Sequence, residues 1–204
     1  MKVDLIQNTN EWREFRNSRI GASDLSVILG VNPWMTAKAL WEEKLKFRAP
    51  KDMTYSMQRG VTMEPIARDL LEKETGLKFT PQVYQHDIHS LMIASLDGVC
   101  EEDQSLCEIK CPGVKNHLLS IDSIVPDHYL WQIEMQFLCS EIEKGYYVSY
   151  NPDHIEQPLV MINISHNPKL HEFIITKVDE FMKCIVTVTQ PEKFKAKPFL
   201  EMCK

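Results

Sequence analysis

A short stretch in the middle of the sequence carries two carboxylates and a lysine at close spacing. It reads ASLDGVCEEDQSLCEIKC, with Asp97 at the end of one apolar run and Glu108, Ile109 and Lys110 in the next. Because side chains alternate along a strand, we expect Glu108 and Lys110 on one face of a sheet and Ile109 on the other. A hairpin between the two runs would place Asp97 beside Glu108. Two carboxylates and the backbone carbonyl of Ile109 form an all-oxygen site suited to Mg²⁺ or Mn²⁺.

This combination of groups is suited to phosphodiester hydrolysis. A bound divalent cation polarises a phosphodiester and lowers the pKa of a bound water. Lys110 could orient the resulting hydroxide or neutralise the charge that develops on the phosphate. The alternative is a solvated hairpin with ordinary surface charges, because a D…E-x-K pattern is short and also occurs by chance.

Further polar residues lie where helices are expected. Glu64 precedes Pro65 at the expected start of a helix, where the helix dipole alone would favour a carboxylate. Gln132 and Gln136 lie four residues apart on one side of another expected helix. They are either solvated or hold a metal-bound water or the substrate backbone.

An anion pocket is predicted near the N-terminus. The segment Arg19-Ile20-Gly21-Ala22-Ser23 puts a guanidinium and a hydroxyl around a glycine turn at the start of an expected helix. Helix N-termini and arginines both bind phosphate groups. A plain helix cap would explain the same residues.

The elements that would position these residues alternate between helices and strands. Helices are predicted over 10–17, from Ser23 or Asp24 to Gly30, from Thr36 to Leu45, and from Pro65 to Gly76, with 46–58 as a polar loop or short helix. Strands are predicted over 77–85, 91–100 and 105–111, then a helix over 127–140, strands over 144–150 and 158–164, and a helix over 168–188. This order predicts an α/β (α+β) fold with a mixed central sheet flanked by helices.

Length and composition indicate one domain. The chain has 204 residues, of which 44% are hydrophobic, enough for one sizeable core and too few for two. No repeat or long linker divides it. We expect a helical part at about 1–76, a sheet-containing core at about 77–190 and a C-terminal tail at about 191–204.

The net charge of −6 argues against a protein that coats DNA along its length. The charge is uneven, however: residues 1–60 hold 10 Lys/Arg against 7 Asp/Glu, whereas residues 61–204 hold 13 against 22. A basic entrance on an acidic surface would repel DNA everywhere except at that entrance.

The same sequence carries no sign of export or membrane insertion. Its N-terminus lacks the apolar run of a signal peptide, and no uncharged apolar run reaches the roughly 18 residues that span a bilayer. The six cysteines include no C-x-x-C pair. We therefore expect a cytoplasmic protein with reduced thiols and no membrane partner.

Taken in order, the motifs resemble those of a known nuclease family. They are R-x-G-x-S at 19–23, G-x-x-x-E at 60–64, Asp97, E-x-K at 108–110 and Q-x-x-x-Q at 132–136. This set resembles the lambda-type 5′→3′ exonucleases, also called YqaJ-like viral recombinases, of the PD-(D/E)XK nuclease superfamily. The resemblance covers about residues 10–150, and Leu96 stands where the superfamily label has proline.

The resemblance implies a restriction-endonuclease-like core and a metal site within it. Asp97, Glu108, Glu64 and the Ile109 carbonyl would hold Mg²⁺, with two ions per site and Mn²⁺ as a substitute. Lys110 would help to activate the water. In the family's pattern, Gln132 lies beside these residues.

The resemblance also implies contacts with DNA. Arg19 and Ser23 would bind the 5′-terminal phosphate, and Gln136 would contact the substrate. Met57, counted back from Gly60, falls where the family has an apolar wedge that splits the end of the duplex.

Such enzymes form ring-shaped homotrimers that degrade the 5′ strand of a double-stranded, 5′-phosphorylated DNA end processively. They leave a 3′ overhang for a single-strand annealing protein in homologous recombination. Two alternatives stay open from the sequence: another DNA nuclease of the superfamily, either an endonuclease or a single-strand exonuclease, and a non-catalytic DNA-end-binding protein.

Overall fold

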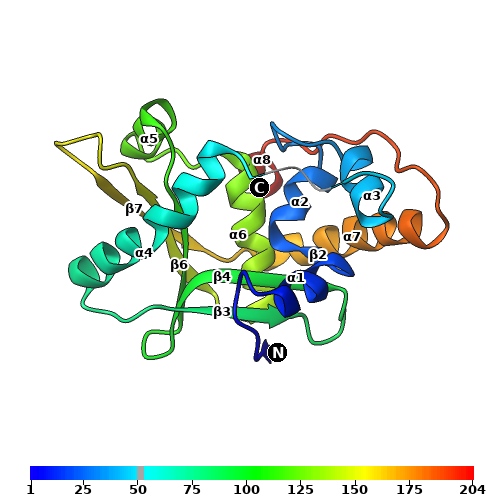
Figure 1. Ribbon diagram of the computed structural model, residues 1–204, viewed down its shortest axis with the longest axis horizontal. Helices are drawn as coiled ribbons and strands as arrows, with labels where there is room; N and C mark the ends of the chain where they lie inside the picture. The colour runs from blue at the N-terminus through cyan, green and yellow to red at the C-terminus, as the bar shows by residue number, and fades with distance from the viewer. Residues whose placement is uncertain (50–52) are drawn as a thin grey trace.

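A seven-stranded mixed β-sheet forms the centre of the computed structural model, which describes residues 1–49 and 53–204 (Figure 1). The strand order is β1-β3-β4-β5-β6-β7, and β2 pairs with β4. The β5–β6 and β2–β4 pairs are parallel and the other pairs are antiparallel. The strands are β1 (Lys2–Val3), β2 (Ile20–Gly21), β3 (Thr80–Gln85), β4 (Met92–Cys100), β5 (Ser105–Lys110), β6 (Lys144–Tyr150) and β7 (Leu159–Ser165). The predicted mixed sheet flanked by helices is therefore confirmed.

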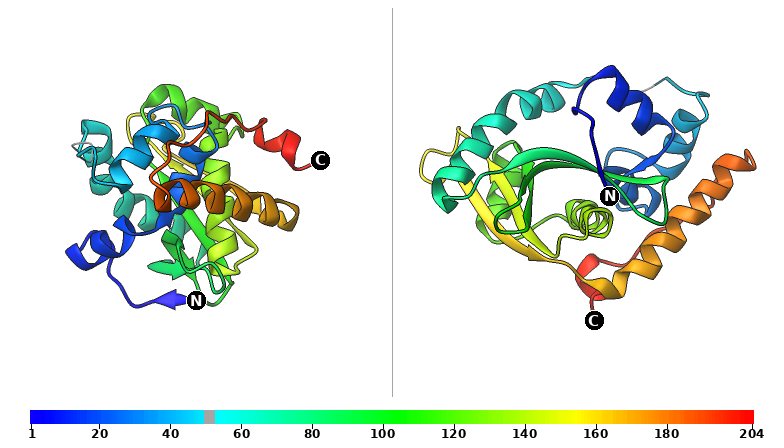
Figure 2. Two further views of the ribbon diagram at one scale, coloured as in Figure 1. Left: turned by 90° about the vertical axis from the view of Figure 1, so that its right-hand side faces the viewer. Right: turned by 90° about the horizontal axis from the view of Figure 1, so that it is seen from below.

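Helices cover both faces of this sheet. Figure 2 shows α6 (Asp127–Ser140) inside the curve of the sheet and α4 (Tyr55–Thr75) on the other side. The remaining helices are α1 (Asn10–Asn17), α2 (Ala22–Ile28), α3 (Ala37–Lys44), α5 (Val114–Ile121), η1 (Pro168–Leu170), α7 (His171–Val186) and α8 (Phe199–Met202). Within the described ranges, no helix is long and apolar enough to cross a membrane.

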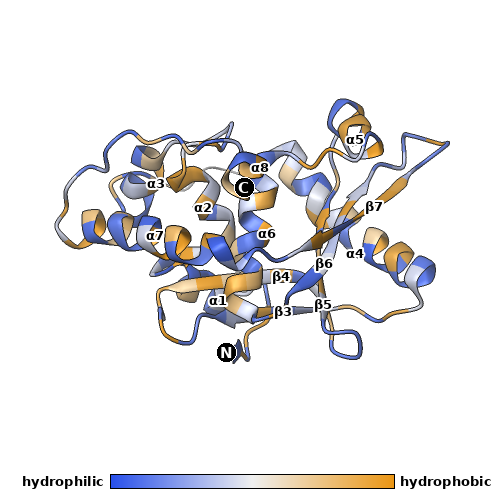
Figure 3. Ribbon diagram, turned by 180° about the vertical axis from the view of Figure 1, so that it is seen from behind, coloured by the Kyte–Doolittle hydropathy of each residue, from blue (hydrophilic) through white to orange (hydrophobic). Residues whose placement is uncertain are grey.

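The two sides of the sheet have separate hydrophobic cores. The larger core joins α2, α6 and α7 to β4, and the smaller core joins Ala67 and Leu71 of α4 to Cys107 and Ile109 of β5. Hydrophobic and hydrophilic residues alternate along α6 (Figure 3), although nearly all of its second half is buried. Buried polar groups need partners, so the polar residues of α6 must find theirs inside the protein.

The start of α4 differs from the prediction. The helix begins at Tyr55 rather than at Pro65, because Thr54 caps it by accepting a hydrogen bond from the Met57 N–H at 3.3 Å. Pro65 lies inside the helix, where it removes the hydrogen bond to the carbonyl of Val61. The Val61 side chain is 49% exposed, so this turn lies where water can replace that bond. Of the loop predicted over 46–58, residues 50–52 lie outside the described residues.

The C-terminal tail packs against the helices of the larger core. The N–H of Ala196 donates to the carbonyl of Leu29 at 2.9 Å, and the Phe199 ring lies edge-on to Trp131 at 5.0 Å. Gly30 has φ +68°, and a Cβ there would lie 2.0 Å from the carbonyl oxygen of Phe194. Only glycine accommodates both that backbone conformation and the close approach of the tail.

Candidate active site

The β4–β5 hairpin brings the predicted carboxylates and lysine together. Gly98 pairs with Cys107, so the next positions along the two strands are those of Asp97 and Glu108. Asp97 Oδ2 accepts a hydrogen bond from the Ile109 N–H at 2.8 Å, and Lys110 Nζ forms an ion pair with Glu108 Oε1. The Ile109 side chain points into the smaller core on the other face. The alternation predicted from the sequence is confirmed.

Two glutamines of α6 hold the carboxylate of Glu108. Nε2 of Gln132 donates to Glu108 Oε1 and Nε2 of Gln136 donates to Glu108 Oε2, both at 2.5 Å. Glu108 is 1% exposed and Gln136 is fully buried. Gln136 was expected to contact the substrate, but in this structure its amide lies behind Glu108 because α6 packs its length against the sheet.

Glu64 reaches the same region from the helix on the opposite face of the sheet. It forms an ion pair with Arg68, one turn further along α4, and Arg68 Nε donates to the backbone carbonyl of Asp97 at 2.8 Å. Glu64 is not at a helix start, as the sequence suggested, but midway along α4. Arg68 was missed, although its spacing of four residues from Glu64 is typical of a helical ion pair.

The local electrostatics favour the binding of a cation. Burial, and then the negative charge of Glu108, raise the pKa of Asp97 well above its usual value. Burial also raises the pKa of Glu64, and the charge of Glu108 adds to this effect. Burial opposes the charge of Lys110, but the carboxylates of Glu108 and Asp97 outweigh it and raise the pKa of Lys110. Three carboxylates crowd one lysine, and a divalent cation would relieve their repulsion.

The donor set also fits such an ion chemically, since carboxylate and carbonyl oxygens are the ligands that Mg²⁺ binds. In this structure the carboxylate oxygens of Glu64, Asp97 and Glu108 do not all lie within 4.8 Å of one another. Among the described residues, the group that brings one ligand atom each to within 4.8 Å of one another is a different one, Glu134, His166 and His171. Glu64, Asp97 and Glu108 would therefore move closer together to share an ion.

Aromatic side chains lie beside Lys110. The Lys110 ammonium lies 5.0 Å from the centroid of the Tyr129 ring, a cation–π contact. Burial, and then the charge of Lys110, lower the pKa of the neighbouring His128 to about 4. The His128 ring meets Trp34 edge-on at 4.9 Å, and Trp34 is 60% exposed. These aromatics were not predicted, because Trp34 is far from Lys110 in the sequence.

The predicted phosphate pocket is arranged differently from expectation. Nη2 of Arg16, not Arg19, donates to the Ser23 hydroxyl, at 2.9 Å. Arg19 stacks on the Phe15 ring at 3.8 Å and donates to the Phe15 carbonyl. Arg19 and Ser23 are thus near each other in the chain, but their side chains do not meet.

A buried acid occupies the start of α2. Asp24 Oδ2 accepts from the Gly21 N–H at 3.0 Å and lies 3.1 Å from Lys44 Nζ, while Arg16 lies 3.5 Å from Oδ1. Burial alone would raise the pKa of Asp24, but Lys44 and Arg16 outweigh it and lower that pKa. The helix start therefore already carries a compensated negative charge.

Met57, the residue expected to act as a wedge, lies in the first turn of α4 and is 51% exposed.

Several known proteins are similar to this chain. The "Uncharacterized protein YqaJ" of Bacillus subtilis (strain 168) is 26% identical over 143 residues, which is 68% of this chain and 45% of that protein. The chain therefore spans less than half the length of this relative.

Solved structures share the fold over most of the chain. The alkaline exonuclease LHK-Exo from Laribacter hongkongensis matches with a TM-score of 0.79 and 25% identity, over 88% of this chain and 94% of that one. The same enzyme in complex with dAMP matches with a TM-score of 0.77, 25% identity and the same coverage. A phage related exonuclease from Haemophilus somnus 129PT shares the fold with a TM-score of 0.69 at 15% identity, over 83% of this chain and 94% of that one.

The family model of the YqaJ-like viral recombinase domain matches residues 11–143. This span contains every motif on which the resemblance in the sequence rests, from the arginine at 19 to the glutamine at 136. It is also well over half of the chain. The chain therefore belongs to the YqaJ-like viral recombinase domain family.

Proposed function

We propose that this protein is a Mg²⁺-dependent exonuclease that degrades double-stranded DNA ends processively in the 5′→3′ direction and leaves 3′ overhangs for recombination by strand annealing. The convergence of Asp97, Glu108 and Lys110, with both oxygens of Glu108 held by glutamine amides, carries the proposal. Family membership supports a DNA exonuclease role. So does the similarity to LHK-Exo, an alkaline exonuclease also known in complex with the deoxynucleotide dAMP.

In this proposal the carboxylates of Asp97, Glu108 and Glu64, with the Ile109 carbonyl, hold two Mg²⁺ ions, for which Mn²⁺ can substitute. The bound metal supplies Lewis-acid chemistry and lowers the pKa of the attacking water. Asp97 and Glu108 lie on neighbouring strands, so the sheet sets their spacing. The ion pair with Arg68 restrains Glu64.

Lys110 acts as a positive charge rather than as a base. Its pKa is raised by its carboxylate neighbours, so it stays protonated at neutral pH. A protonated lysine can orient the water and stabilise the negative charge that develops on the phosphate. Gln132 and Gln136 position the Glu108 carboxylate, and for Gln136 we propose this role in place of a contact with DNA.

The proposed DNA contacts lie at the surface of the N-terminal part. Arg19 and Ser23 bind the 5′-terminal phosphate, helped by Arg16, which already donates to Ser23. Met57, exposed on the first turn of α4, is the proposed wedge at the end of the duplex. The proposed partners are 5′-phosphorylated duplex ends, two further copies of the chain in a ring, and a single-strand annealing protein.

The test is digestion of linear duplex DNA labelled at one end, with and without a 5′-phosphate, in Mg²⁺ and in EDTA. We expect label at the 5′ end to be released first, in Mg²⁺ only, and faster with the phosphate. Glu108→Gln should abolish release, whereas Glu102→Gln, in the exposed turn of the same hairpin, should not. Activity that survives Glu108→Gln, or that ignores the phosphate, would refute the proposal.

Two further substrates separate the alternatives. Nicking of covalently closed circular DNA would show an endonuclease, and preference for single strands would show a single-strand exonuclease. End binding without cleavage in Mg²⁺ or Mn²⁺ would show a non-catalytic protein. Light scattering on the same preparation measures whether the chain is a trimer.

A further inference from the structure

A buried acid on α6 lies on the side of the helix away from the candidate active site. Glu134 is placed between Gln132 and Gln136 in the sequence, but two residues along a helix is a rotation of about 200°. Its side chain therefore points away from Glu108. It is 1% exposed and meets His166, the residue that follows β7.

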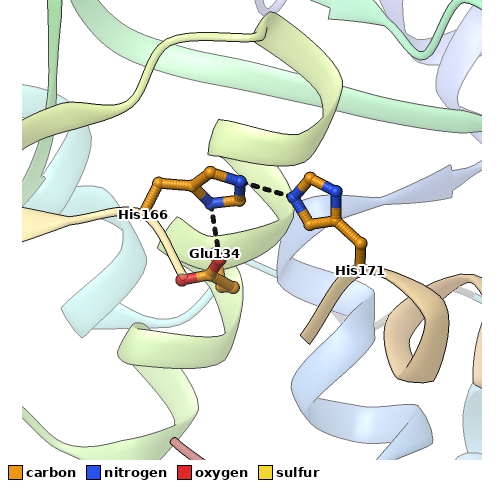
Figure 4. A group of neighbouring side chains, drawn as sticks. All are labelled: Glu134, His166 and His171. Carbon is orange, nitrogen blue, oxygen red and sulfur yellow. Dashed lines mark hydrogen bonds and ion pairs between the residues drawn. The ribbon is translucent and has the colours of Figure 1, made fainter. Parts of the chain in front are cut away.

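Two histidines complete a three-residue group with Glu134 (Figure 4). His166 Nδ1 lies 2.6 Å from Glu134 Oε1, and His166 Nε2 faces Nε2 of His171, the first residue of α7. One ligand atom from each of the three residues lies within 4.8 Å of the other two. The group thus joins α6, the end of β7 and the start of α7.

The contact between His166 and Glu134 has the distance of a hydrogen bond but not the direction. The His166 side chain is 10% exposed, and its Nδ1 makes no hydrogen bond among the described residues. By contrast, both ring nitrogens of the buried His117 have partners at 2.8 Å, the hydroxyl of Ser149 and the carbonyl of Gln157. His166 differs from His117 in that, within the described part of the chain, only its Nε2, which meets His171, has a hydrogen-bond partner.

The misaligned Nδ1 of His166 is available to a cation. A hydrogen bond needs its donor to point along the line between the two heavy atoms. Two ligands of one metal ion instead point their lone pairs at a third position, off that line. His166 faces Glu134 with Nδ1 and His171 with Nε2, on different edges of its ring. Glu134 Oε1 also accepts a hydrogen bond from the Asn167 N–H at 2.9 Å. One ligand atom of each residue lies within 4.8 Å of the other two, so small side-chain rotations would turn all three toward one ion.

We propose that Glu134, His166 and His171 bind one Zn²⁺ ion, at a site separate from the carboxylates of the candidate active site. Two imidazole nitrogens and one carboxylate oxygen are a borderline-soft set that suits Zn²⁺ and Co²⁺, whereas Mg²⁺ binds oxygen ligands. A water would complete the tetrahedron. The ion would tie α6, and with it the two glutamines that hold Glu108, to the β7–α7 connection.

The proposal does not rest on the nuclease function, and its test needs no DNA. The 204-residue protein is stripped with a chelator, dialysed and titrated with Co²⁺, whose visible absorption reports a tetrahedral site. It is then titrated with Zn²⁺ in competition. We expect one Co²⁺ per chain, displaced by Zn²⁺ and not by an equal concentration of Mg²⁺. Zn²⁺ at about 100-fold above its Kd should raise the Tm by about 5–10 °C.

Variants decide whether these residues hold the ion. His171 is only partly buried, so His171→Ala should fold, and it should weaken Co²⁺ binding by at least about 100-fold and abolish the Zn²⁺-dependent rise in Tm. Glu134→Gln should have the same effect. The matched control is His89→Ala, which removes a histidine 3.8 Å from the carboxylate of Asp179 and should bind Co²⁺ like the parent.

Three results would overturn the site: no tetrahedral Co²⁺ spectrum, parental affinity in His171→Ala, or a thiolate charge-transfer band, which would assign the ion to cysteines. A protein that binds Zn²⁺ in this way but does not digest DNA would leave the zinc site standing and remove the proposed nuclease function. A protein that digests DNA but binds no Zn²⁺ in this way would remove the zinc site and leave the proposed nuclease function standing.

Discussion

Replacing Gln136 by leucine tests how the fold holds the carboxylate of Glu108. The amide of Gln136 donates to Glu108 Oε2 at 2.5 Å, and both side chains are buried, so water cannot take the place of the lost donor. Leucine is of similar size and leaves no large cavity. The main effect of the substitution is therefore the loss of the hydrogen bond to the charged Glu108, since the other bond of this amide, to the Ser95 carbonyl, is long at 3.4 Å.

The size of the effect follows from that bond. A hydrogen bond to a charged group contributes about 1.5–3 kcal/mol, and one between neutral groups contributes about 0.5–1.5 kcal/mol. At about 2–4 °C per kcal/mol for a chain of this length, Gln136→Leu should lower the Tm by about 3–12 °C. In a Glu108→Gln background the same substitution should lower the free energy of unfolding by about half as much, because the side chain at 108 is then a neutral acceptor.

The assay is thermal unfolding, followed by circular dichroism in EDTA, of the parent, both single variants and the double variant. The four values form a double-mutant cycle whose coupling energy should be about 1 kcal/mol. Glu102→Gln is the control and should stay within about 0.5 kcal/mol of the parent. An equal loss of stability in both backgrounds, or none in either, would refute the reasoning that the amide stabilises the charge of Glu108.

Other substitutions test separate parts of the structure. Lys110→Met should slow duplex digestion by a factor of about 10² to 10³, because it removes the charge that stabilises the phosphate, while far-UV circular dichroism stays unchanged. A smaller loss in single-turnover kinetics would argue against the proposed role of Lys110. Asp24→Asn should lower the free energy of unfolding at pH 7 by about 3–5 kcal/mol, because it leaves the ammonium of Lys44 buried without its carboxylate partner at 3.1 Å. The folded-state pKa of Asp24 is lowered, so in the parent this stabilisation is complete above about pH 4 and is lost as the pH falls through that lowered pKa. Urea titrations at several pH values measure this pH-dependent stabilisation. A parent protein whose free energy of unfolding does not change below about pH 4 would contradict the stabilising role of the ionised Asp24. Gly30→Ala should destabilise the protein by about 1–3 kcal/mol, since φ is +68° and the new Cβ would meet a carbonyl oxygen of the tail at 2.0 Å. Gly60→Ala, inside α4 with no atom within 4 Å of the new Cβ, should stabilise it by about 0.5–1 kcal/mol, and equal Tm values for the two variants would show this account to be wrong.

Local patterns in the sequence correctly predicted the longer strands and the faces of the central hairpin, but not β1, β2, α5, α8 or the start of α4. Alternation along β5 placed Glu108 and Lys110 together and Ile109 opposite them, because successive residues of a strand always point to opposite faces. Thr36 and Gly76 marked helix ends through a side-chain cap and a left-handed backbone, which depend only on neighbouring residues. The order of the motifs was also sufficient to predict the family.

Contacts between distant elements were decided by the tertiary structure alone. The spacing of Gln132 and Gln136 indicated a shared helix face, but only the packing of α6 inside the curved sheet turned that face toward Glu108. Local spacing likewise predicted that Arg19 would meet Ser23, whereas the turn between α1 and α2 brought Arg16 there.

The group of Glu134, His166 and His171 was invisible in the sequence for the same reason. Its members come from one helix, the end of a strand and the start of another helix, and no local rule relates them. Sequence periodicity sets which way a side chain points from its own element. Which side chain it meets depends on how whole elements pack, and that is settled by burial summed over the entire core.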